Sequence, residues 1–233
     1  MVKNDPEQCP DRFPIPAFQA GNGLGRSHVV VLDALLKLRQ VCCDPRLVKL
    51  QSARPGGRSS KLEDLLEMVG EMIAEGRRIL LFSQFTSMLD LMKPKLKAAG
   101  ITFVELRGDT KDRAAPVRSF EAEEVPLFLI SLKAGGRGLN LTSADTVIHY
   151  DPWWNPAVED QASDRAHRIG QTKSVFVYKL IAADTVEERI LELQERKAML
   201  ASIALSEEGA PWPAMDAEDI DFLFGDNHYR LAA

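Results

Sequence analysis

Short apolar runs alternate with amphipathic stretches through the middle of the chain. The runs are short enough for buried strands, and most of the stretches between them have the three-to-four-residue spacing of helices. Strands that alternate with helices favour right-handed β-α-β units, which build a parallel sheet covered on both faces. The pattern therefore predicts an α/β fold with a mostly parallel sheet and helices on both faces. Its five predicted strands are RRILLFSQ, ITFVELRG, VPLFLISLK, TVIHYDP and VFVYKLIA.

The stretch SSKLEDLLEMVGEMIAEG has the clearest helical pattern. Ser60 and Glu63 have the spacing of a capping box, and Gly76 is typical of the residue that ends a helix. The apolar face of this helix consists of Leu62, Leu65, Leu66, Val69, Met72 and Ile73. Further helices are predicted over residues 28–43, over 86–99 with a kink at Pro94, over 113–121, from Asn155, and from a capping box at Thr185 and Glu188.

These elements divide the chain into four segments. Residues 1–27 are rich in proline and glycine and are predicted to be a linker or a disordered start. Residues 28–58 form a helical segment that leads into an α/β domain at 59–183, and residues 184–233 hold the last long helix and an acidic tail. With 233 residues and 45% hydrophobic content, the chain suffices for one packed domain with a small appendage.

The net charge of −5 hides an asymmetry. Residues 184–226 carry twelve acidic and three basic side chains, so the rest of the chain is mildly basic at +4. The mildly basic part of the chain is compatible with an anionic partner but is not evidence for one.

The composition argues against secreted, metal-binding and membrane classes. The three cysteines, Cys9, Cys42 and Cys43, are an odd number without C-x-x-C spacing, so neither a disulfide framework nor a zinc site is supported. The sequence begins without an apolar signal-peptide run. Its apolar stretches are far shorter than the roughly 20 residues of a membrane helix. We expect a soluble, intracellular protein with no membrane partner.

A glycine-rich loop, SLKAGGRGLNLTSADT, follows the third predicted strand. Gly135, Gly136 and Gly138 let the backbone turn sharply, and bare N–H groups in such a loop can cradle phosphate. The loop lacks the G-K-[ST] ending of a P-loop, as does the rest of the sequence, so it does not hold a triphosphate and Mg²⁺ by itself. A plain tight turn is the alternative interpretation.

The segment YDPWWNPAVEDQASDRAHRIGQ follows the fourth predicted strand. Asn155 is a strong N-cap and Pro156 suits the first helical position. From that start, helical spacing places Val158, Gln161, Arg165 and Arg168 on one face. A solvated surface with an Asp164–Arg168 ion pair, worth about 0.2–0.5 kcal/mol, is the alternative. This helix follows a strand end and lies beside a glycine-rich loop, which favours a ligand-binding site, since ligands bind where parallel strands end.

Taken together, four motifs resemble the C-terminal RecA-like lobe of the Swi/Snf-type ATPases of helicase superfamily two. They are LLFSQFTSML, LRGDT, LISLKAGGRGLNLTSADTVIHYDPWWNP and DRAHRIGQ, in that order along the chain. The resemblance extends to LLKLRQVCCDP before the lobe and to TVEERILELQERKAML, which is similar to the family's brace helix. The DRAHRIGQ form separates these ATPases from the RNA helicases of the superfamily. The fold implied is RecA-like with a C-terminal brace helix.

The resemblance implies that two lobes close on ATP. It implies that the N-terminal lobe holds most of the ATP and Mg²⁺, and that Arg165 and Arg168 are arginine fingers for the γ-phosphate. Gln161 would position the phosphate or couple it to motion, while His167 has either a packing or a site role. The positions expected near the nucleotide are Gly136, Gly138, Asn140 and Asp164.

The resemblance also implies a grip on the backbone of duplex DNA. Backbone phosphates are held by cations and N–H groups without reading sequence, so affinity should be salt-sensitive. Trp154 either lies against the minor groove or packs under the helix start, whereas Trp153 is expected to be structural. Arg137, Pro94 and Pro116 depart from the family pattern. The positions expected to contact DNA are Ser83, Gln84, Arg107, Gly108, Ser131, Lys133, Gly135 and Trp154.

The expected function is the C-terminal lobe of an ATP-dependent double-stranded DNA translocase. Its partners would be duplex DNA, an N-terminal RecA-like lobe in the same polypeptide or from a split gene, and a DNA-bound protein substrate. Without a P-loop, the sequence predicts no ATPase activity for this chain alone. A non-catalytic DNA-binding or interaction module is the alternative, and an RNA helicase lobe a weaker one. The expected location is the cytoplasm with the nucleoid in a bacterium, or the nucleus in a eukaryote.

Overall fold

All five predicted strands form one parallel sheet. In this computed structural model the described residues are 24–48, 59–135, 139–167, 173–204 and 217–224. The strands lie in the order β2-β3-β1-β4-β5, and every neighbouring pair is parallel. The α/β prediction is therefore confirmed. The strand bounds are β1 Ile79–Ser83, β2 Phe103–Leu106, β3 Leu127–Ser131, β4 Thr146–His149 and β5 Phe176–Lys179.

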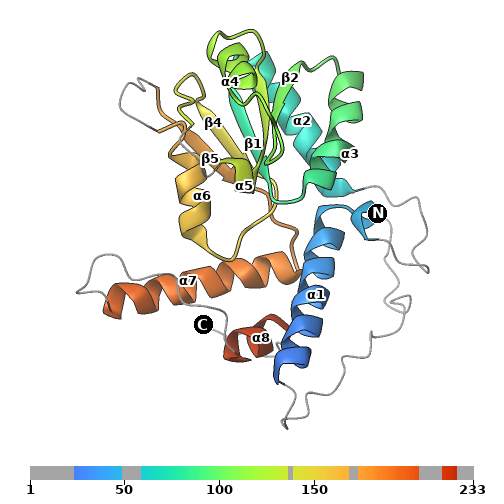
Figure 1. Ribbon diagram of the computed structural model, residues 1–233, viewed down its shortest axis with the longest axis vertical. Helices are drawn as coiled ribbons and strands as arrows, with labels where there is room; N and C mark the ends of the chain where they lie inside the picture. Colours follow the sequence, from blue (N-terminus) through green and yellow to red (C-terminus); the bar gives the residue numbers. More distant parts are fainter. Residues whose placement is uncertain (1–23, 49–58, 136–138, 168–172, 205–216, 225–233) are drawn as a thin grey trace, which may run out of the picture.

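The helices connect the strands and extend beyond the sheet at both ends of the chain (Figure 1). The predicted helices are present, and two short ones, α5 and α8, were not predicted. Their bounds are α1 Leu24–Cys43, α2 Ser60–Ala74, α3 Thr86–Ala98, α4 Ala114–Glu121, α5 Leu132–Gly135, α6 Pro156–Ser163, α7 Val186–Ala204 and α8 Ala217–Phe224, with a 3-10 turn, η1, at Pro45–Leu47.

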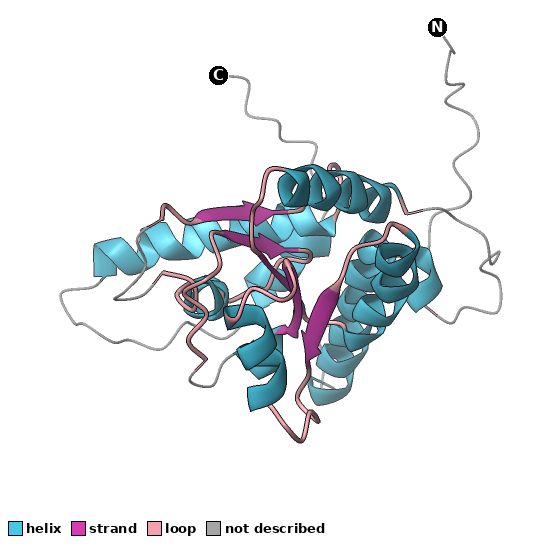
Figure 2. Cartoon of the chain, turned by 90° about the horizontal axis from the view of Figure 1, so that it is seen from above, coloured by secondary structure: helices cyan, strands magenta, loops and turns pink. Residues whose placement is uncertain are grey.

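Helices cover both faces of the sheet because side chains alternate along each strand (Figure 2). Ile79 and Leu81 of β1 pack into a core with α2 and α3. Leu80 and Phe82 point the other way, into a core that includes residues of α4 and α6. The apolar pattern of the edge strand β5 predicts a buried strand, but its residues Phe176 and Val177 are 46% and 49% exposed.

Local signals fixed most helix ends to within a residue. The N-cap of α2 is Ser59, whose Oγ accepts from the Leu62 N–H, so the predicted capping box at Ser60 is one residue late. Gly76 follows α2 with φ +80°, a conformation that favours glycine. Asn155 caps α6 as predicted, and its Oδ1 accepts from Ala157 N–H. Helix α3 continues through Pro94.

Three helices, α1, α7 and α8, form a separate helical unit. They share a small core of Leu35, Val186, Ile190, Leu193 and Leu223. Figure 1 shows this unit at one end of the molecule, below the sheet. The predicted leading helix and brace helix, far apart in sequence, therefore pack together. Among the described residues, no helix has the length and apolarity needed to cross a bilayer.

Candidate functional site

The carboxyl ends of the strands bring most of the predicted DNA-contacting positions to one edge. Ser83 at the end of β1 is in register with Ser131 at the end of β3. The neighbouring strand β2 ends just before Arg107, and β4 ends just before Tyr150. Because neighbouring parallel strands end at the same edge, the loops after β2, β3, β1 and β4 lie side by side.

Two of these loops are held by internal polar contacts, and we call them the anchored loops: residues 83–85 and 150–155. Asp151 is buried between them, and Ser83 Oγ donates a 2.6 Å hydrogen bond to its Oδ1. The Gln84 N–H also donates to this carboxylate, at 3.1 Å from Oδ2. Ser83 is only 1% exposed, so its hydroxyl is used inside the protein rather than presented to a ligand. Burial raises the pKa of Asp151 to about 6, even though these hydrogen bonds and Arg39 favour the charged form.

A buried arginine of α1 lies against the same loops. Arg39 has no exposed surface, and its Cζ lies 4.5 Å from the ring centroid of Trp154 and 5.5 Å from that of Trp153. One of its amino groups donates to the carbonyl of Pro152. Burial lowers the pKa of Arg39, an effect that the nearby Asp151 charge opposes. Trp154 is half-buried and packs against the core of the helical unit.

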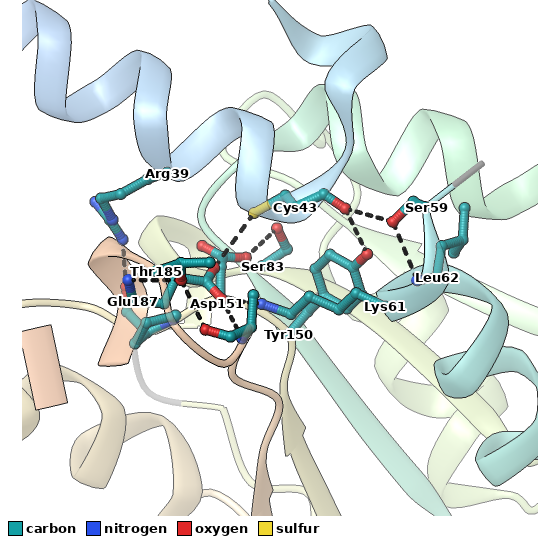
Figure 3. Close-up of polar contacts among 12 residues, drawn as sticks. Arg39, Cys43, Ser59, Lys61, Leu62, Ser83, Tyr150, Asp151, Thr185 and Glu187 are labelled. Carbon is teal, nitrogen blue, oxygen red and sulfur yellow. Dashed lines mark hydrogen bonds and ion pairs between the residues drawn. The ribbon is translucent and has the colours of Figure 1, made fainter. Parts of the chain in front are cut away.

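A second buried pair ties α2 to α7 next to this arginine. Lys61 Nζ lies 2.6 Å from Glu187 Oε2, and this carboxylate also accepts from the Ala182 N–H at 2.9 Å. The carbonyl of Cys43, at the end of α1, accepts from the hydroxyls of both Tyr150 and Ser59. Figure 3 shows these contacts around the end of α1. The helical unit is therefore joined to the sheet edge through polar side chains.

The anchored loop at residues 150–155 also makes contacts with α6 and α7. The Trp153 N–H donates to Glu159 Oε1 at 2.6 Å, and its carbonyl accepts from the side-chain amide of Gln194. Glu159 is buried and its Oε2 lies 2.6 Å from Lys179 Nζ. Trp153 packs against the core on the α4 and α6 face, consistent with its predicted structural role.

The other two segments are the loop at 107–110 and residues 131–135, which comprise the end of β3 and the short helix α5. They present more of their polar groups to solvent, and we call them the open loops. Gly108 and Lys133 are exposed, and a side chain on Gly108 would meet no atom within 4 Å. Ser131 is buried at the end of β3. Arg107 forms ion pairs with Asp90 and Glu105, so its charge is compensated within the protein. Hydrogen bonding to Arg107 lowers the pKa of Asp90 to about 2.

The segment predicted to carry the arginine fingers departs from a continuous helix. Helix α6 ends at Ser163, and residues 164–166 form a turn, so the prediction that the helix continues through Arg168 is wrong. Arg165 lies in this turn and is 4% exposed, whereas Gln161 is exposed, so they do not share a face. The carbonyl of Arg165 accepts from the Leu141 N–H at 3.0 Å. A tertiary contact therefore accompanies the early end of the helix.

The turn meets the loop that continues from the glycine-rich segment. Because Leu141 bonds to Arg165, the exposed Asn140 and Asp164 belong to two segments that are in contact. His167 is also exposed. The structure thus brings together parts of the predicted nucleotide-facing set. Gly136, Gly138 and Arg168 lie outside the described residues, as does Arg137.

A buried histidine connects the sheet to the end of α6. His149, the last residue of β4, stacks on Phe82 with ring centroids 5.5 Å apart. Its Nε2 lies 2.9 Å from the Oγ of Ser163, the last residue of α6. Burial lowers the pKa of His149 to about 4, with a smaller effect from Lys179. The imidazole is therefore neutral at pH 7 and holds the end of α6 without a charge.

Sequence reasoning missed Arg39, Asp151 and Glu187. Arg39 had a signal, because Leu35, Arg39 and Cys43 follow at intervals of four along α1 and all three are buried. An arginine on the apolar stripe of a helix should have suggested a buried partner.

Comparisons with known proteins agree with this geometry. Residues 60–170 match the family model described as "Helicase conserved C-terminal domain". A "Putative ATP-dependent helicase/translocase YwqA" from Bacillus subtilis is 41% identical over 201 residues, which is 84% of this chain and 22% of that protein. A "Chromatin-remodeling ATPase INO80" from Neurospora crassa is 46% identical over 151 residues, which is 64% of this chain and 8% of that protein. The chain thus spans less than a quarter of the length of these relatives.

A solved structure supports the same assignment. The SWI2/SNF2 ATPase core domain of Sulfolobus solfataricus superposes with a TM-score of 0.63 at 35% sequence identity, covering 81% of this chain and 38% of that one. The parallel five-stranded sheet and the ordered motifs agree with this match. The chain carries a helicase conserved C-terminal domain, and its RecA-like lobe is similar to those of Swi/Snf-type ATPases.

Proposed function

We propose that this chain is the C-terminal lobe of an ATP-dependent double-stranded DNA translocase. In this proposal a separate N-terminal RecA-like lobe binds ATP and Mg²⁺, and this lobe completes the site and grips the DNA backbone. The observation that carries the proposal is the contact between the Arg165 turn and the Leu141 segment, because it joins the end of α6 to the segment that continues from the glycine-rich loop after β3. In open parallel sheets, ligands bind in the loops that follow the carboxyl ends of the strands, and the glycine-rich loop is one of these.

The side chains at this contact suit one half of a nucleotide site. Gln161, Asp164 and Asn140 are exposed beside the turn, while the sequence holds no P-loop to retain a triphosphate. Exposed polar groups of this kind can position phosphate oxygens once a second lobe supplies the rest. The role of this lobe would therefore be to complete a site rather than to form one.

Arginine is the residue that phosphoryl transfer favours at such a position. Charge spreads over the equatorial oxygens in the transition state, and a planar, permanently charged guanidinium can meet two of them. Arginine fingers contribute about 10³–10⁵ in rate, or roughly 4–7 kcal/mol. We assign this role to Arg165 and Arg168. Arg165 is buried and Arg168 lies outside the described residues, so each needs its own variant.

For the DNA grip, the open loops are the stronger candidates. Lys133 is exposed and forms no ion pair among the described residues, so its ammonium is available to a phosphate. Exposed backbone at Gly108 can approach a phosphate closely, and we assign Gly135, at the end of α5, to the same grip. Arg107 could bind phosphate only by exchanging its two carboxylate partners.

The anchored loops have a different role in the proposed DNA binding. Ser83 is buried, so it would act by shaping the edge, and Gln84 retains only part of its surface. Ser131, at the start of an open loop, is also buried and would act in the same way. Trp154 is half-buried, so one edge of its indole could still meet a duplex groove. We therefore assign direct phosphate contact to the open loops and surface shape to the anchored loops.

The proposal is tested by mixing the chain with a P-loop lobe from a two-lobe relative. Phosphate release stimulated by duplex DNA is expected only when both lobes are present. Failure to hydrolyse ATP where the intact relative is active would contradict the catalytic role. DNA binding without any such hydrolysis would instead support a non-catalytic DNA-binding module, and equal affinity for duplex RNA would argue against a DNA translocase.

A further inference from the structure

Arg39 is the least expected side chain in the molecule. It is fully buried on α1, yet within the described part of the chain its guanidinium makes a single hydrogen bond, to the Pro152 carbonyl. Among the described residues, its Nε and Nη1 atoms have no hydrogen-bond partner. A buried guanidinium costs several kcal/mol to desolvate, and an apolar side chain of similar size often stabilises a fold at least as well. Packing alone therefore gives a poor account of an arginine here.

Aromatic rings surround this cation. Its Cζ lies 4.5 Å from the ring centroid of Trp154, 5.5 Å from that of Trp153 and 5.9 Å from that of Phe85. A planar cation can stack on several aromatic rings at once, and the attraction strengthens when water is excluded. The contacts therefore fix ring positions rather than merely filling space.

The ring contacts reach both anchored loops. Phe85 lies in the first loop, directly after Ser83 and Gln84, whose Oγ and N–H bind Asp151 of the second loop. Trp154 lies in the second loop and also packs against the helical unit. The Arg39 charge acts on Asp151 as well, where it favours the carboxylate. One side chain of α1 thus touches the loops that follow β1 and β4.

We propose that Arg39 is a positioning residue, which holds Trp153 and Trp154 and thereby sets the shape of the anchored loops at the DNA-facing edge. The contribution to DNA binding rests on the proposed function; the control of the indoles does not. Since α1 packs with α7 and α8, Arg39 is also the point at which the helical unit sets the position of that edge. Lysine cannot replace it, because an ammonium has no plane to stack on two indoles.

The experiment uses the full chain with Trp212, which lies outside the described residues, replaced by Phe. Fluorescence then reports Trp153 and Trp154 alone. Arg39→Lys and Arg39→Met are compared with the parent by acrylamide quenching, under conditions where circular dichroism shows a folded chain. Both variants are expected to show stronger quenching and a red-shifted emission maximum. Arg39→Lys keeps charge and stem length, so it provides a folded variant if Arg39→Met unfolds.

Arg78 is the matched control. It is also a buried arginine over an aromatic ring, 4.6 Å from the Phe120 centroid, and it donates to the Phe120 carbonyl, but it precedes β1 at the opposite edge of the sheet. Arg78→Lys is expected to lower stability without changing the quenching. Unchanged quenching in the folded Arg39 variants, or equal increases for Arg39→Lys and Arg78→Lys, would overturn the proposal.

DNA affinity separates this inference from the proposed function. Arg39→Lys is expected to weaken duplex binding about threefold or more in the parent, but much less in a Trp154→Ala background, because coupled residues are not additive. If Trp154→Ala leaves DNA binding unchanged, Trp154 is not a DNA contact, and the quenching result alone decides whether Arg39 positions the loop.

Discussion

The anchored and open loops occupy one edge of the same sheet and use their polar groups in opposite ways. In the anchored loops, the buried Asp151 carboxylate accepts hydrogen bonds from the Ser83 hydroxyl and the Gln84 N–H. In the open loops, Lys133 and Gly108 face solvent. Both sets have the polar composition of ligand-binding loops. A polar motif at a strand end therefore shows where a site is, but burial decides which of its groups can touch a ligand.

This contrast indicates that the anchored loops contribute mainly to stability and the open loops mainly to DNA binding. Buried polar groups cost energy when their partners are lost, whereas an exposed lysine costs almost nothing to remove. Substitutions in or behind the anchored loops should therefore alter unfolding, and substitutions at the exposed, unpaired positions of the open loops, such as Lys133, should alter DNA affinity alone.

The largest expected effect is at Glu187, behind the anchored loops. Glu187→Ala leaves the Lys61 ammonium and the Ala182 N–H without their buried partner. Removing one member of a buried ion pair costs about 3–5 kcal/mol of unfolding free energy. Urea denaturation followed by circular dichroism measures this loss. The double variant Lys61→Met with Glu187→Leu should be much less destabilised; a double variant as unstable as Glu187→Ala would contradict the ion-pair explanation.

The next effect is a pH dependence from Asp151. Its folded pKa of about 6 exceeds its ordinary value of 3.8, so its stability contribution is present below pH 4 and is lost as the pH rises to about 6. Two pKa units correspond to about 3 kcal/mol. Asp151→Asn keeps an acceptor for Ser83 and removes this titration. Relative to wild type, the variant should gain stability across that window; a constant difference would contradict a buried carboxylate.

His149 should show the opposite sign over nearly the same window. Its folded pKa of about 4 lies below the ordinary 6.5, so its stability contribution is present above pH 6.5 and is lost as the pH falls toward 4. His149→Phe keeps the stack on Phe82 but cannot titrate. Relative to wild type, this variant should become more stable as the pH falls from 6.5 to 4, by about 3 kcal/mol at most. If the difference in unfolding free energy between the variant and wild type is the same at pH 6.5 and at pH 4, the interpretation of His149 as a buried neutral imidazole is wrong.

The smallest effect on stability belongs to the open loops. Lys133→Ala should change the unfolding free energy by no more than about 0.5 kcal/mol, because its ammonium is solvated. It should reduce the slope of log affinity for duplex DNA against log salt by about 0.9, as expected for one lost phosphate contact. Lys111→Ala, at another exposed lysine directly after the 107–110 loop, is the control. An unchanged slope in Lys133→Ala would exclude Lys133 from the interface.

The fold was predictable because several local signals agreed. Apolar runs, caps and turn glycines gave the five strands, their helices and the parallel arrangement, with Gly76 and Asn155 in the conformations expected. The exposed β5 was not foreseen, because an apolar run does not reveal whether its strand lies at an edge. The early end of α6 was also missed, since no local breaker follows Ser163. Contacts from His149 to Ser163 and from Leu141 to Arg165 accompany that end.

The candidate site was predictable in location but not in detail. The motifs identified the loops at the correct edge, because parallel strands place all their carboxyl ends together. They did not reveal that Ser83 is buried against Asp151 or that Arg107 is paired with Asp90. These contacts join residues 68 and 17 positions apart, which no local pattern encodes. The roles of Arg165, Arg168 and Gln161 stay predictions.

The most direct test of the account is single-turnover ATP hydrolysis by a two-lobe enzyme that contains this lobe. Arg168→Lys should slow hydrolysis about 10²-fold or more while duplex DNA affinity stays near the wild-type value, because a lysine cannot reproduce the guanidinium fork at the γ-phosphate. Arg165→Lys should slow hydrolysis comparably and, being buried, should also lower stability. Hydrolysis at the wild-type rate in both variants would contradict the proposal that this lobe supplies arginine fingers.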